Sequence, residues 1–361
     1  MITREEIAEL VAKYDLDRLA IGTIGSHSAL NIFKGAKEEG FRTVCICKEK
    51  DLIVYKKFPL TDEIIVVDDF TEILGNRVQE NLRAANTVVV AHGSFTAYLS
   101  TEQLTDSFYV PILGNRLLLH WEASRERQEQ WLRKAGLRLP ETFKSPEEID
   151  RLVIAKLPGA KGGRGYFLAN SPQGFQKKVR EMIGRGLLSV EDVERIHLQE
   201  YVLGVNVYPH YFSSIIRDDV EFLGVDKRYE STADGIGRVP ADEQIEAGMG
   251  STYTVVGNIP LTLRESLLPE LLNMGDNVQK AAAEIAPPGI IGPFCLETVI
   301  SDQLEIYTFE ISARIVAGTN AGIGTSPYAY LRYGENMYAG RRIAREIREA
   351  LSRKRLQEVV T

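Results

Sequence analysis

Two glutamates near the end of the chain are spaced as a pair that could bind a metal ion. Glu297 and Glu310 lie in two strand-like runs, residues 292–300 and 304–314, which a short turn joins. If the loop holds an even number of residues, both side chains share one face of the hairpin as a diagonal cross-strand pair, about 7–8 Å apart at their α-carbons. Carboxylates beside apolar neighbours require a cation, and Mg²⁺ prefers one or two carboxylates together with phosphate oxygens. The spacing therefore predicts a Mg²⁺ site.

The same register makes further predictions. Glu297 would lie opposite Thr308, and Phe309 would point to the other, apolar face of the hairpin. A loop with an odd number of residues would instead turn the two glutamates to opposite faces. The alternative to a metal site is a pair of glutamates neutralised by a salt bridge, with Arg314 as the partner.

A glycine-rich stretch predicts a site for a multiply charged anion. A buried strand over residues 152–155 ends at Lys156, and a second strand-like run follows at residues 166–169. Glycine has no Cβ and tolerates positive φ, so it lets backbone N–H groups approach an anion closely. Three cations in the stretch favour a nucleoside triphosphate. The glycines and the cations between them are Gly159, Lys161, Gly162, Gly163, Arg164 and Gly165.

The residue order in this stretch excludes two common phosphate-binding loops. No Gly-Lys pair is followed by Ser or Thr, as a Walker loop requires. A dinucleotide fingerprint lies between a strand and a helix, whereas a strand follows here. We favour a flap that folds over phosphates, and a flexible surface hairpin with solvated charges is the alternative.

Two polar loops near the N-terminus form a third candidate site. Gly-Ser-His-Ser at residues 25–28 and His-Gly-Ser-Phe at residues 92–95 each follow a strand-like run, and they contain His27 and Ser94. In open parallel sheets, ligands bind outside the carboxyl ends of the strands, and a helix N-terminus there favours a phosphate or carboxylate. A plain N-cap beside a solvated His27 is the alternative for the first loop.

These candidates require an α/β framework of three regions. Residues 1–114 alternate strands and helices, as a Rossmann-like parallel sheet does. Residues 115–210 hold a linker helix and the glycine-rich flap, and residues 211–361 hold the carboxylate hairpin. The expected strands are 18–24, 41–47, 64–67, 87–91, 195–202, 206–212 and 220–225; the expected helices are 29–39, 73–82, 115–135, 172–184 and 261–285; a turn is expected at 256–260.

Composition limits the possible partners. The 361 residues suffice for two or three domains, and the net charge of −7 argues against a broad nucleic-acid surface. The apolar runs are too short to span a membrane, and the N-terminus has no apolar signal core. The three cysteines give neither a disulfide framework nor a metal knuckle. We therefore expect a cytoplasmic protein that binds neither nucleic acid nor membrane.

The ordered set of motifs resembles one enzyme family over essentially the whole chain. The motifs are Gly-Ser-His-Ser, His-Gly-Ser-Phe, Lys-Leu-Pro-Gly-Ala-Lys-Gly-Gly-Arg-Gly-Tyr-Phe, Asp-Lys-Arg-Tyr-Glu, Gly-Asn-Ile-Pro, Gly-Pro-Phe-Cys-Leu and Phe-Glu-Ile-Ser-Ala-Arg. Together they look like the archaeal formate-dependent formaminoimidazole-carboxamide ribonucleotide (FAICAR) synthetases of the ATP-grasp superfamily. The resemblance implies an α/β ATP-grasp fold with a Rossmann-like N-terminal domain.

The resemblance also implies a reaction and an assembly. Such enzymes join formate to the 5-amino group of aminoimidazole-carboxamide ribonucleotide (AICAR) in purine biosynthesis. They consume ATP with Mg²⁺ or Mn²⁺ and release ADP and phosphate, by way of formyl phosphate. The family suggests homo-oligomers, either trimers or hexamers. An ATP-grasp ligase for another carboxylate and amine, and a purine-nucleotide sensor without turnover, are the competing interpretations.

Site residues follow from the match to the family motifs. The ribonucleotide would be held by His27, Ser94 and Asn258, and the metal by Glu297 and Glu310. We infer independently that Arg314 stabilises the transferring phosphoryl group. Ser312 stands where the wider superfamily commonly has an asparagine, so the sequence supports one metal ion better than two. The residues expected to bind ATP are Lys156, Gly162, Gly163, Glu200, Tyr201, Val202, Asn206 and Glu230.

Overall fold

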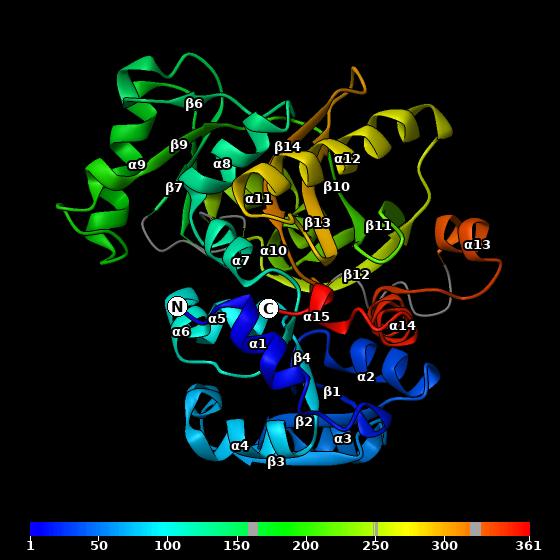
Figure 1. Ribbon diagram of the computed structural model, residues 1–361. Coiled ribbons are helices and arrows are strands. Elements are labelled where there is room, and N and C mark those ends of the chain that lie inside the picture. Colours follow the sequence, from blue (N-terminus) through cyan, green and yellow to red (C-terminus); the bar gives the residue numbers. More distant parts are fainter. Residues whose placement is uncertain (158–164, 248, 250–251, 318–325) are drawn as a thin grey trace.

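Three β-sheets organise the chain (Figure 1). The computed structural model describes residues 1–361 except 158–164, 248, 250–251 and 318–325. Within the described residues, a five-stranded sheet of order β3-β2-β1-β4-β5 is here called the parallel sheet. A four-stranded sheet of order β6-β9-β7-β8 is called the lid sheet, and a five-stranded sheet of order β12-β11-β10-β13-β14 is called the large sheet.

The parallel sheet confirms the alternating pattern predicted for the first region. All of its strand pairs are parallel, and β1 and β4 are buried along their whole length, as a sheet covered on both faces requires. Its strands are β1 Ala20–Ile24, β2 Arg42–Lys48, β3 Glu63–Val67, β4 Thr87–Val90 and β5 Ile112–Leu113. The helices of this region are α1 Arg4–Val11, α2 Ala29–Glu38, α3 Leu52–Lys57, α4 Asn76–Ala84, α5 Gly93–Tyr98 and α6 Thr101–Asp106.

The lid sheet is small and packs on one helix. Phe167 on β8 and Phe175 on α9 meet with ring centroids 5.5 Å apart, inside a separate apolar cluster. The strands are β6 Thr142–Phe143, β7 Val153–Lys156, β8 Tyr166–Ala169 and β9 His197–Glu200, and the helix is α9 Pro172–Gly184. Gly162 and Gly163, which were expected to bind phosphates, lie between β7 and β8 and outside the described residues.

The large sheet is antiparallel throughout, and one face is apolar. Tyr211 and Phe294 stack on that face, and helices α8 and α12 cover it through Trp131 and Val278. The strands are β10 Val205–Ser214, β11 Asp219–Glu230, β12 Val255–Leu261, β13 Gly292–Ile300 and β14 Ile306–Ser312. The helices are α7 Arg116–Glu122, α8 Arg125–Lys134, α10 Ser231–Gly235, α11 Ala241–Glu246, α12 Leu268–Ile285, α13 Pro327–Tyr333, α14 Ala339–Ser352 and α15 Leu356–Val359.

Three expectations about elements are wrong. The helix predicted over 115–135 is divided into α7 and α8, because Ser124 caps a new helix by accepting the Arg127 N–H. The turn predicted at 256–260 is strand β12, whose edge position tolerates Pro260. The boundary predicted at residue 210 falls inside β10, so the chain passes from the lid sheet to the large sheet between β9 and β10 instead.

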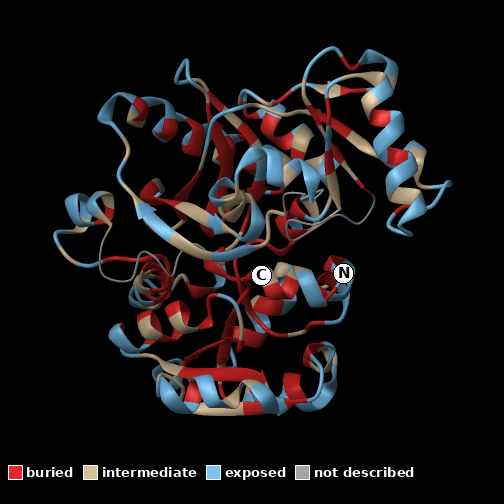
Figure 2. Ribbon diagram, turned by 180° about the vertical axis from the view of Figure 1, so that it is seen from behind, coloured by how far each residue is buried: buried red, intermediate tan, exposed pale blue. Residues whose placement is uncertain are grey.

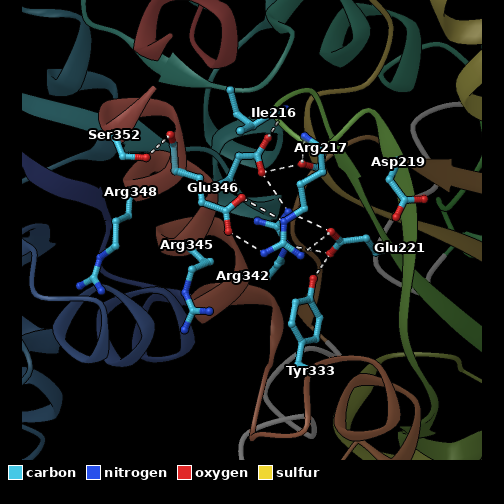
Figure 3. Close-up of polar contacts among 12 residues, drawn as sticks. Ile216, Arg217, Asp219, Glu221, Tyr333, Arg342, Arg345, Glu346, Arg348 and Ser352 are labelled. Atoms are coloured by element: carbon cyan, nitrogen blue, oxygen red, sulfur yellow. Dashed lines mark hydrogen bonds and ion pairs between the residues drawn. The ribbon is translucent and has the colours of Figure 1, made fainter. Parts of the chain in front are cut away.

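Helix α14 joins the large sheet to the parallel sheet (Figure 1). On one side it lies against α2, so closely that a Cβ on Gly340 would collide with the backbone of Asn31. On the other side, Arg342 is fully buried and donates two hydrogen bonds to Glu221 on β11, at 2.7 and 2.9 Å, and one to Glu346, at 2.9 Å (Figure 3). Glu346 in turn accepts from the Ser214 hydroxyl at 2.8 Å.

The distribution of burial agrees with this arrangement. The strands of the parallel and large sheets and the inner side of α14 are mainly buried, whereas the outer faces of the surrounding helices are exposed (Figure 2). No helix within the described residues is both long and apolar enough to cross a membrane.

We predict that Arg342→Met destabilises the protein by about 3 kcal/mol, because removing one partner leaves buried carboxylates without compensation. Chemical unfolding monitored by circular dichroism measures the change. Arg348→Met on the same helix is the matched control, since Arg348 is half exposed and its ion pair with Glu39 is 3.3 Å long. Equal stability of the two variants would contradict a structural role for the Arg342 cluster.

Candidate active site

One face of the large sheet carries most of the predicted site residues. Because paired residues in an antiparallel sheet point to the same side, the register can be followed from strand to strand. Asn206 pairs with Val299 on β13, Arg228 pairs with Asn258, and Glu297 pairs with Glu310. This face is opposite the apolar one that packs on α12, so the polar residues are concentrated on the side that faces the other sheets. Its predicted site residues are Asn206, Glu230, Asn258, Glu297 and Glu310.

The two glutamates lie directly opposite each other. They share one face, as expected, but the even loop on which that expectation rested and the diagonal register are both wrong. Ile300 pairs with Ile306, which leaves an odd loop of residues 301–305, and Thr308 pairs with Thr298 rather than with Glu297. The register shifts by one residue between Glu297 and Thr298, which leaves Phe309 as the extra residue of a β-bulge. Phe309 therefore packs with the cluster of Tyr208, Cys295 and Val316 and does not join the apolar face.

Arg228 neutralises Glu297. Its guanidinium donates to both carboxylate oxygens, at 2.8 and 2.6 Å, and stacks over the Tyr208 ring with 3.8 Å between the guanidinium carbon and the ring centroid. Glu297 is 8% exposed, so the two charged hydrogen bonds largely replace its hydration. The alternative of two salt-bridged glutamates therefore holds for Glu297 only within the described residues, and its partner is Arg228, because Arg314 pairs with Glu122 instead.

Glu310 has no such partner in the described structure, and its side chain is open to solvent. Partial desolvation by the surrounding protein and the negative charge of Glu297 together raise the pKa of Glu310 to about 7. Because the carboxylate is open to water, we give the repulsion from Glu297 the greater weight. Because the Glu310 carboxylate has no neutralising ion pair, it is suited to bind a metal ion.

The donor set fits a metal ion that also binds a phosphate. No group of three or more His, Cys, Asp or Glu side chains suited to a metal occurs in the described part of the chain. Glu297 and Glu310 therefore offer two carboxylates, and further oxygen ligands would have to come from substrate and water, as is common for Mg²⁺. Ser312 is buried on the same face, opposite Cys295.

Lys156 and the lid sheet face the carboxylate pair. Lys156 Nζ donates to Gln199 Oε1 at 2.9 Å. Burial lowers the pKa of Lys156, and the charge of Glu310 opposes that effect. Burial and then the charge of Glu310 raise the pKa of Tyr166, the first residue of β8. Both effects place the end of the lid sheet near Glu310.

The segment expected to bind adenine runs from the end of β9. The Glu200 carboxylate accepts the Glu141 N–H at 3.1 Å, and the Tyr201 N–H donates to Leu152 at 2.9 Å. Tyr201 and Val202 are half-buried beyond the strand. These contacts fix the end of β9 within the lid sheet and leave the following residues at its border with the large sheet.

Glu230 and Asn258 lie on the same face as the glutamates, but at the β12 edge of the large sheet, opposite the β14 edge. Burial and then the charge of Asp234 raise the pKa of Glu230 to about 7. The buried Asn258 Nδ2 has no hydrogen-bond partner within the described structure. A buried amide donor without a partner is costly, so this atom is suited to a ligand.

The two N-terminal loops meet in a pair of stacked histidines. The rings of His27 and His92 are parallel, with centroids 5.2 Å apart. His92 is fully buried, its Nε2 lies 2.9 Å from Ile24 O, and its Nδ1 accepts the Ser94 N–H at 3.1 Å. The Ser94 hydroxyl donates to Ser26 at 3.1 Å. His92 must therefore be neutral, with its proton on Nε2.

His27 occupies a strained loop position. Its φ is 54°, and its Nδ1 lies 2.9 Å from the Ser28 hydroxyl, which donates to Val316 O at 2.8 Å. A Cβ at Gly93 would lie 2.7 Å from His27 Nε2, so the stacked arrangement requires glycine there. Burial, followed by the charges of Arg314 and Arg228, lowers the pKa of His27 to about 4. The His27 loop therefore lies near two cations, Arg314 and Arg228 of the large-sheet region, which oppose protonation of its ring.

Arg314 follows β14 and is held by Glu122, with Nη2 2.8 Å from the carboxylate. The next residue, Ile315, forms a parallel bridge with His92. The chain segment that follows β14 thus pairs with the loop of His92, and Arg314 lies between Glu310 and this bridge.

Sequence reasoning missed Arg228 and Glu122 as site residues. Arg228 lies in the charge-dense run Asp-Lys-Arg-Tyr-Glu, where Asp226, Arg228 and Glu230 alternate on one face. That alternation was a usable signal. Glu122 lies at the end of a helix, and no local pattern distinguishes it from an exposed glutamate.

We predict that stability falls by about 2 kcal/mol between pH 7 and pH 5 because of His92. Burial and the nearby charge of His27 lower its pKa from 6.5 to about 3. The unfolded chain therefore binds more protons across this range, and acidification favours unfolding. His92→Asn keeps an acceptor for the Ser94 N–H and should show a flatter pH dependence in thermal unfolding. Identical slopes for the variant and the wild type would refute this assignment.

The chain is similar to known proteins over its whole length. Residues 174–361 match a family described as "Domain of unknown function (DUF1297)", and residues 21–143 match one described as "Protein of unknown function (DUF1246)". A protein of Methanopyrus kandleri named 5-formaminoimidazole-4-carboxamide-1-(beta)-D-ribofuranosyl 5'-monophosphate synthetase is 50% identical over 100% of both chains. A protein of the same name from Methanocaldococcus jannaschii is 47% identical, again over 100% of both chains.

Solved structures agree as well. The crystal structure of an IMP biosynthesis protein PurP from Thermococcus kodakaraensis is 33% identical with a TM-score of 0.76, and the match covers 94% of this chain and 100% of that one. A biotin carboxylase from Campylobacter jejuni, at 12% identity and a TM-score of 0.60 over 90% of this chain and 70% of that one, shares the fold alone. The fold is therefore that of the ATP-grasp proteins. The chain belongs to the family of 5-formaminoimidazole-4-carboxamide-1-(beta)-D-ribofuranosyl 5'-monophosphate synthetases.

Proposed function

We propose that this protein catalyses the ATP- and formate-dependent formylation of AICAR to FAICAR, a step of IMP biosynthesis, and releases ADP and phosphate. The observation that carries the proposal is the carboxylate pair Glu297 and Glu310, directly opposed on the large sheet and faced by Lys156. The names of the relatives, at up to 50% identity over the full length, supply the substrate class.

The nucleotide would lie between the lid sheet and the large sheet. Lys156 would hold a phosphate, Gly162 and Gly163 would cover the phosphates, and Glu200–Val202 would meet the adenine edge. Asn206 and Glu230 would contact the remaining polar groups of the nucleotide. Glu297 and Glu310 would hold Mg²⁺ or Mn²⁺, which when bound neutralises phosphate oxygens.

The chemistry requires positioning and charge neutralisation more than covalent help. A formate oxygen would attack the γ-phosphorus as the bond to ADP breaks, giving formyl phosphate. The 5-amino nitrogen of AICAR would then attack the formyl carbon, phosphate would leave, and the nitrogen would lose a proton. Arg314 would stabilise the transferring phosphoryl group, and Arg228 would compensate the charge of Glu297 through its two hydrogen bonds.

The ribonucleotide would bind at the histidine loops and reach across to β12. His27 and Ser94 lie on the loops, next to the charges of Arg314 and Arg228. Asn258 Nδ2 has no hydrogen-bond partner within the described residues and would donate to the ribonucleotide. In this arrangement the amine would lie beside the carboxylate pair.

We also propose that the protein is cytoplasmic and assembles as a homo-oligomer, a trimer or hexamer. The edge strand β12 supports self-association, because its side chains Val256 and Ile259 are 68% and 48% exposed. Sedimentation velocity tests the assembly, and a monomer at micromolar concentration would contradict it.

We predict that phosphate is released only when ATP, Mg²⁺, formate and AICAR are all present. We also predict that Glu310→Gln lowers turnover at least ~100-fold, because the metal and its phosphate lose a charged ligand. A coupled phosphate assay with single omissions measures both effects. Release without formate would exclude formate as the acid and favour another carboxylate. ATP binding without any turnover in the wild type would favour a sensor.

Asn258→Asp should raise KM for AICAR about 10- to 100-fold while KM for ATP stays within twofold, because the variant loses a donor at the ribonucleotide only. Initial-rate kinetics with each substrate varied separately provide the test. Asn273→Asp on the exposed side of α12 is the matched control. A selective rise in KM for ATP would assign Asn258 to the nucleotide instead.

A further inference from the structure

The outer edge of β14 is stabilised by a pair of helices. β14 is the last strand of the large sheet, so its outer N–H groups face no other strand. The Thr308 N–H donates to Arg138 O at 2.8 Å, the Ile311 N–H to Gln128 Oε1 at 3.0 Å, and the Ala313 N–H to Glu122 Oε2 at 2.8 Å. α7, α8 and the turn after α8 thus fix the position of the strand that carries Glu310.

Glu122 is the last of these acceptors and makes two contacts. One carboxylate oxygen accepts the Ala313 N–H, and the other lies 2.8 Å from Arg314 Nη2. Glu122 is 8% exposed, and burial raises the pKa of its carboxyl. A buried carboxylate that binds both a backbone group and the neighbouring guanidinium restrains the orientation of that guanidinium.

The orientation of the Arg314 guanidinium depends on its contact with Glu122. Within the described structure Glu122 is its only ion-pair partner, and Arg314 Nε is buried without a hydrogen bond. The charge of Arg314 contributes to the lowered pKa values of both His27 and His92. The guanidinium therefore stands between the histidine loops and the carboxylate strand, with Glu122 behind it.

We propose that Glu122 is a positioning residue, which holds the Arg314 guanidinium at the place where the transferring phosphoryl group and the acceptor meet. This inference rests on the proposed function, because it assigns a role in that reaction. A hydrophobic residue at position 122 would avoid the cost of burying a charge, so the ion pair is better explained by orientation than by stability.

The first test is Glu122→Gln, which keeps the volume and an oxygen for the Ala313 N–H but removes the charge. We expect kcat to fall about 10- to 100-fold, as a misplaced catalytic group predicts, with ATP binding by calorimetry unchanged. Glu39→Gln is the matched control, because Glu39 is 1% exposed, is paired with Arg345 at 2.7 Å, and caps the C-terminal end of α2, outside the candidate site. It should lose stability but keep kcat. A kcat for Glu122→Gln within twofold of the wild type would overturn the proposal.

The second test remains informative even if Glu122→Gln does not fold. In Arg314→Ala, the intact Glu122 leaves an anionic pocket shaped for a guanidinium. Added guanidinium ions at non-denaturing concentration should restore part of kcat, whereas equal concentrations of methylammonium or potassium should not. Equal effects of the three cations, or none, would overturn the proposal. An inactive wild type would instead refute the proposed function, so the two failures are distinguishable.

Discussion

Two like charges set directly opposite each other on neighbouring strands are the constraint on which this structure depends. Glu297 and Glu310 repel, and the repulsion contributes to a pKa of about 7 for Glu310. Like charges at opposed positions destabilise a sheet unless cations compensate them. Arg228 compensates Glu297, and Lys156 approaches from the lid sheet. Glu310 has no ion-pair partner within the described residues, and a metal ion with bound phosphate would compensate its charge.

The fold keeps the groups around this pair in place through connections that are distant in sequence. β14 continues past Arg314 into a bridge between Ile315 and His92, which ties the carboxylate strand to the parallel sheet. α14 provides the second connection, because Arg342 binds the large sheet while the opposite side of the helix lies against α2. The acceptor loops and the carboxylates are therefore held in one arrangement by these contacts.

Elements that depend on the periodicity of apolar residues could be predicted from the sequence. Contacts that depend on the register between strands could not. The parallel sheet followed from its strand and helix pattern. The two glutamates, by contrast, share a face only because the bulge at Phe309 offsets the odd loop between Ile300 and Ile306. The bulge at Phe309 shifted the pairing by one residue, and no local signal marks such a bulge. Strand β12 was predicted to be a turn because proline is rare in central strands, but β12 lies at the edge of the sheet, where Pro260 is tolerated. Arg228 was missed because the partner of Glu297 lies 69 residues away.

A crystal structure with Mn²⁺ and a non-hydrolysable ATP analogue, with the metal located by anomalous scattering, would reveal whether the opposed glutamates bind a metal. We expect a Mn²⁺ ion bound by both Glu297 and Glu310 and by a phosphate oxygen of the analogue, with Lys156 on the same phosphates. An ion placed elsewhere, or an analogue bound while Arg228 still occupies both oxygens of Glu297 and no metal touches Glu310, would contradict it.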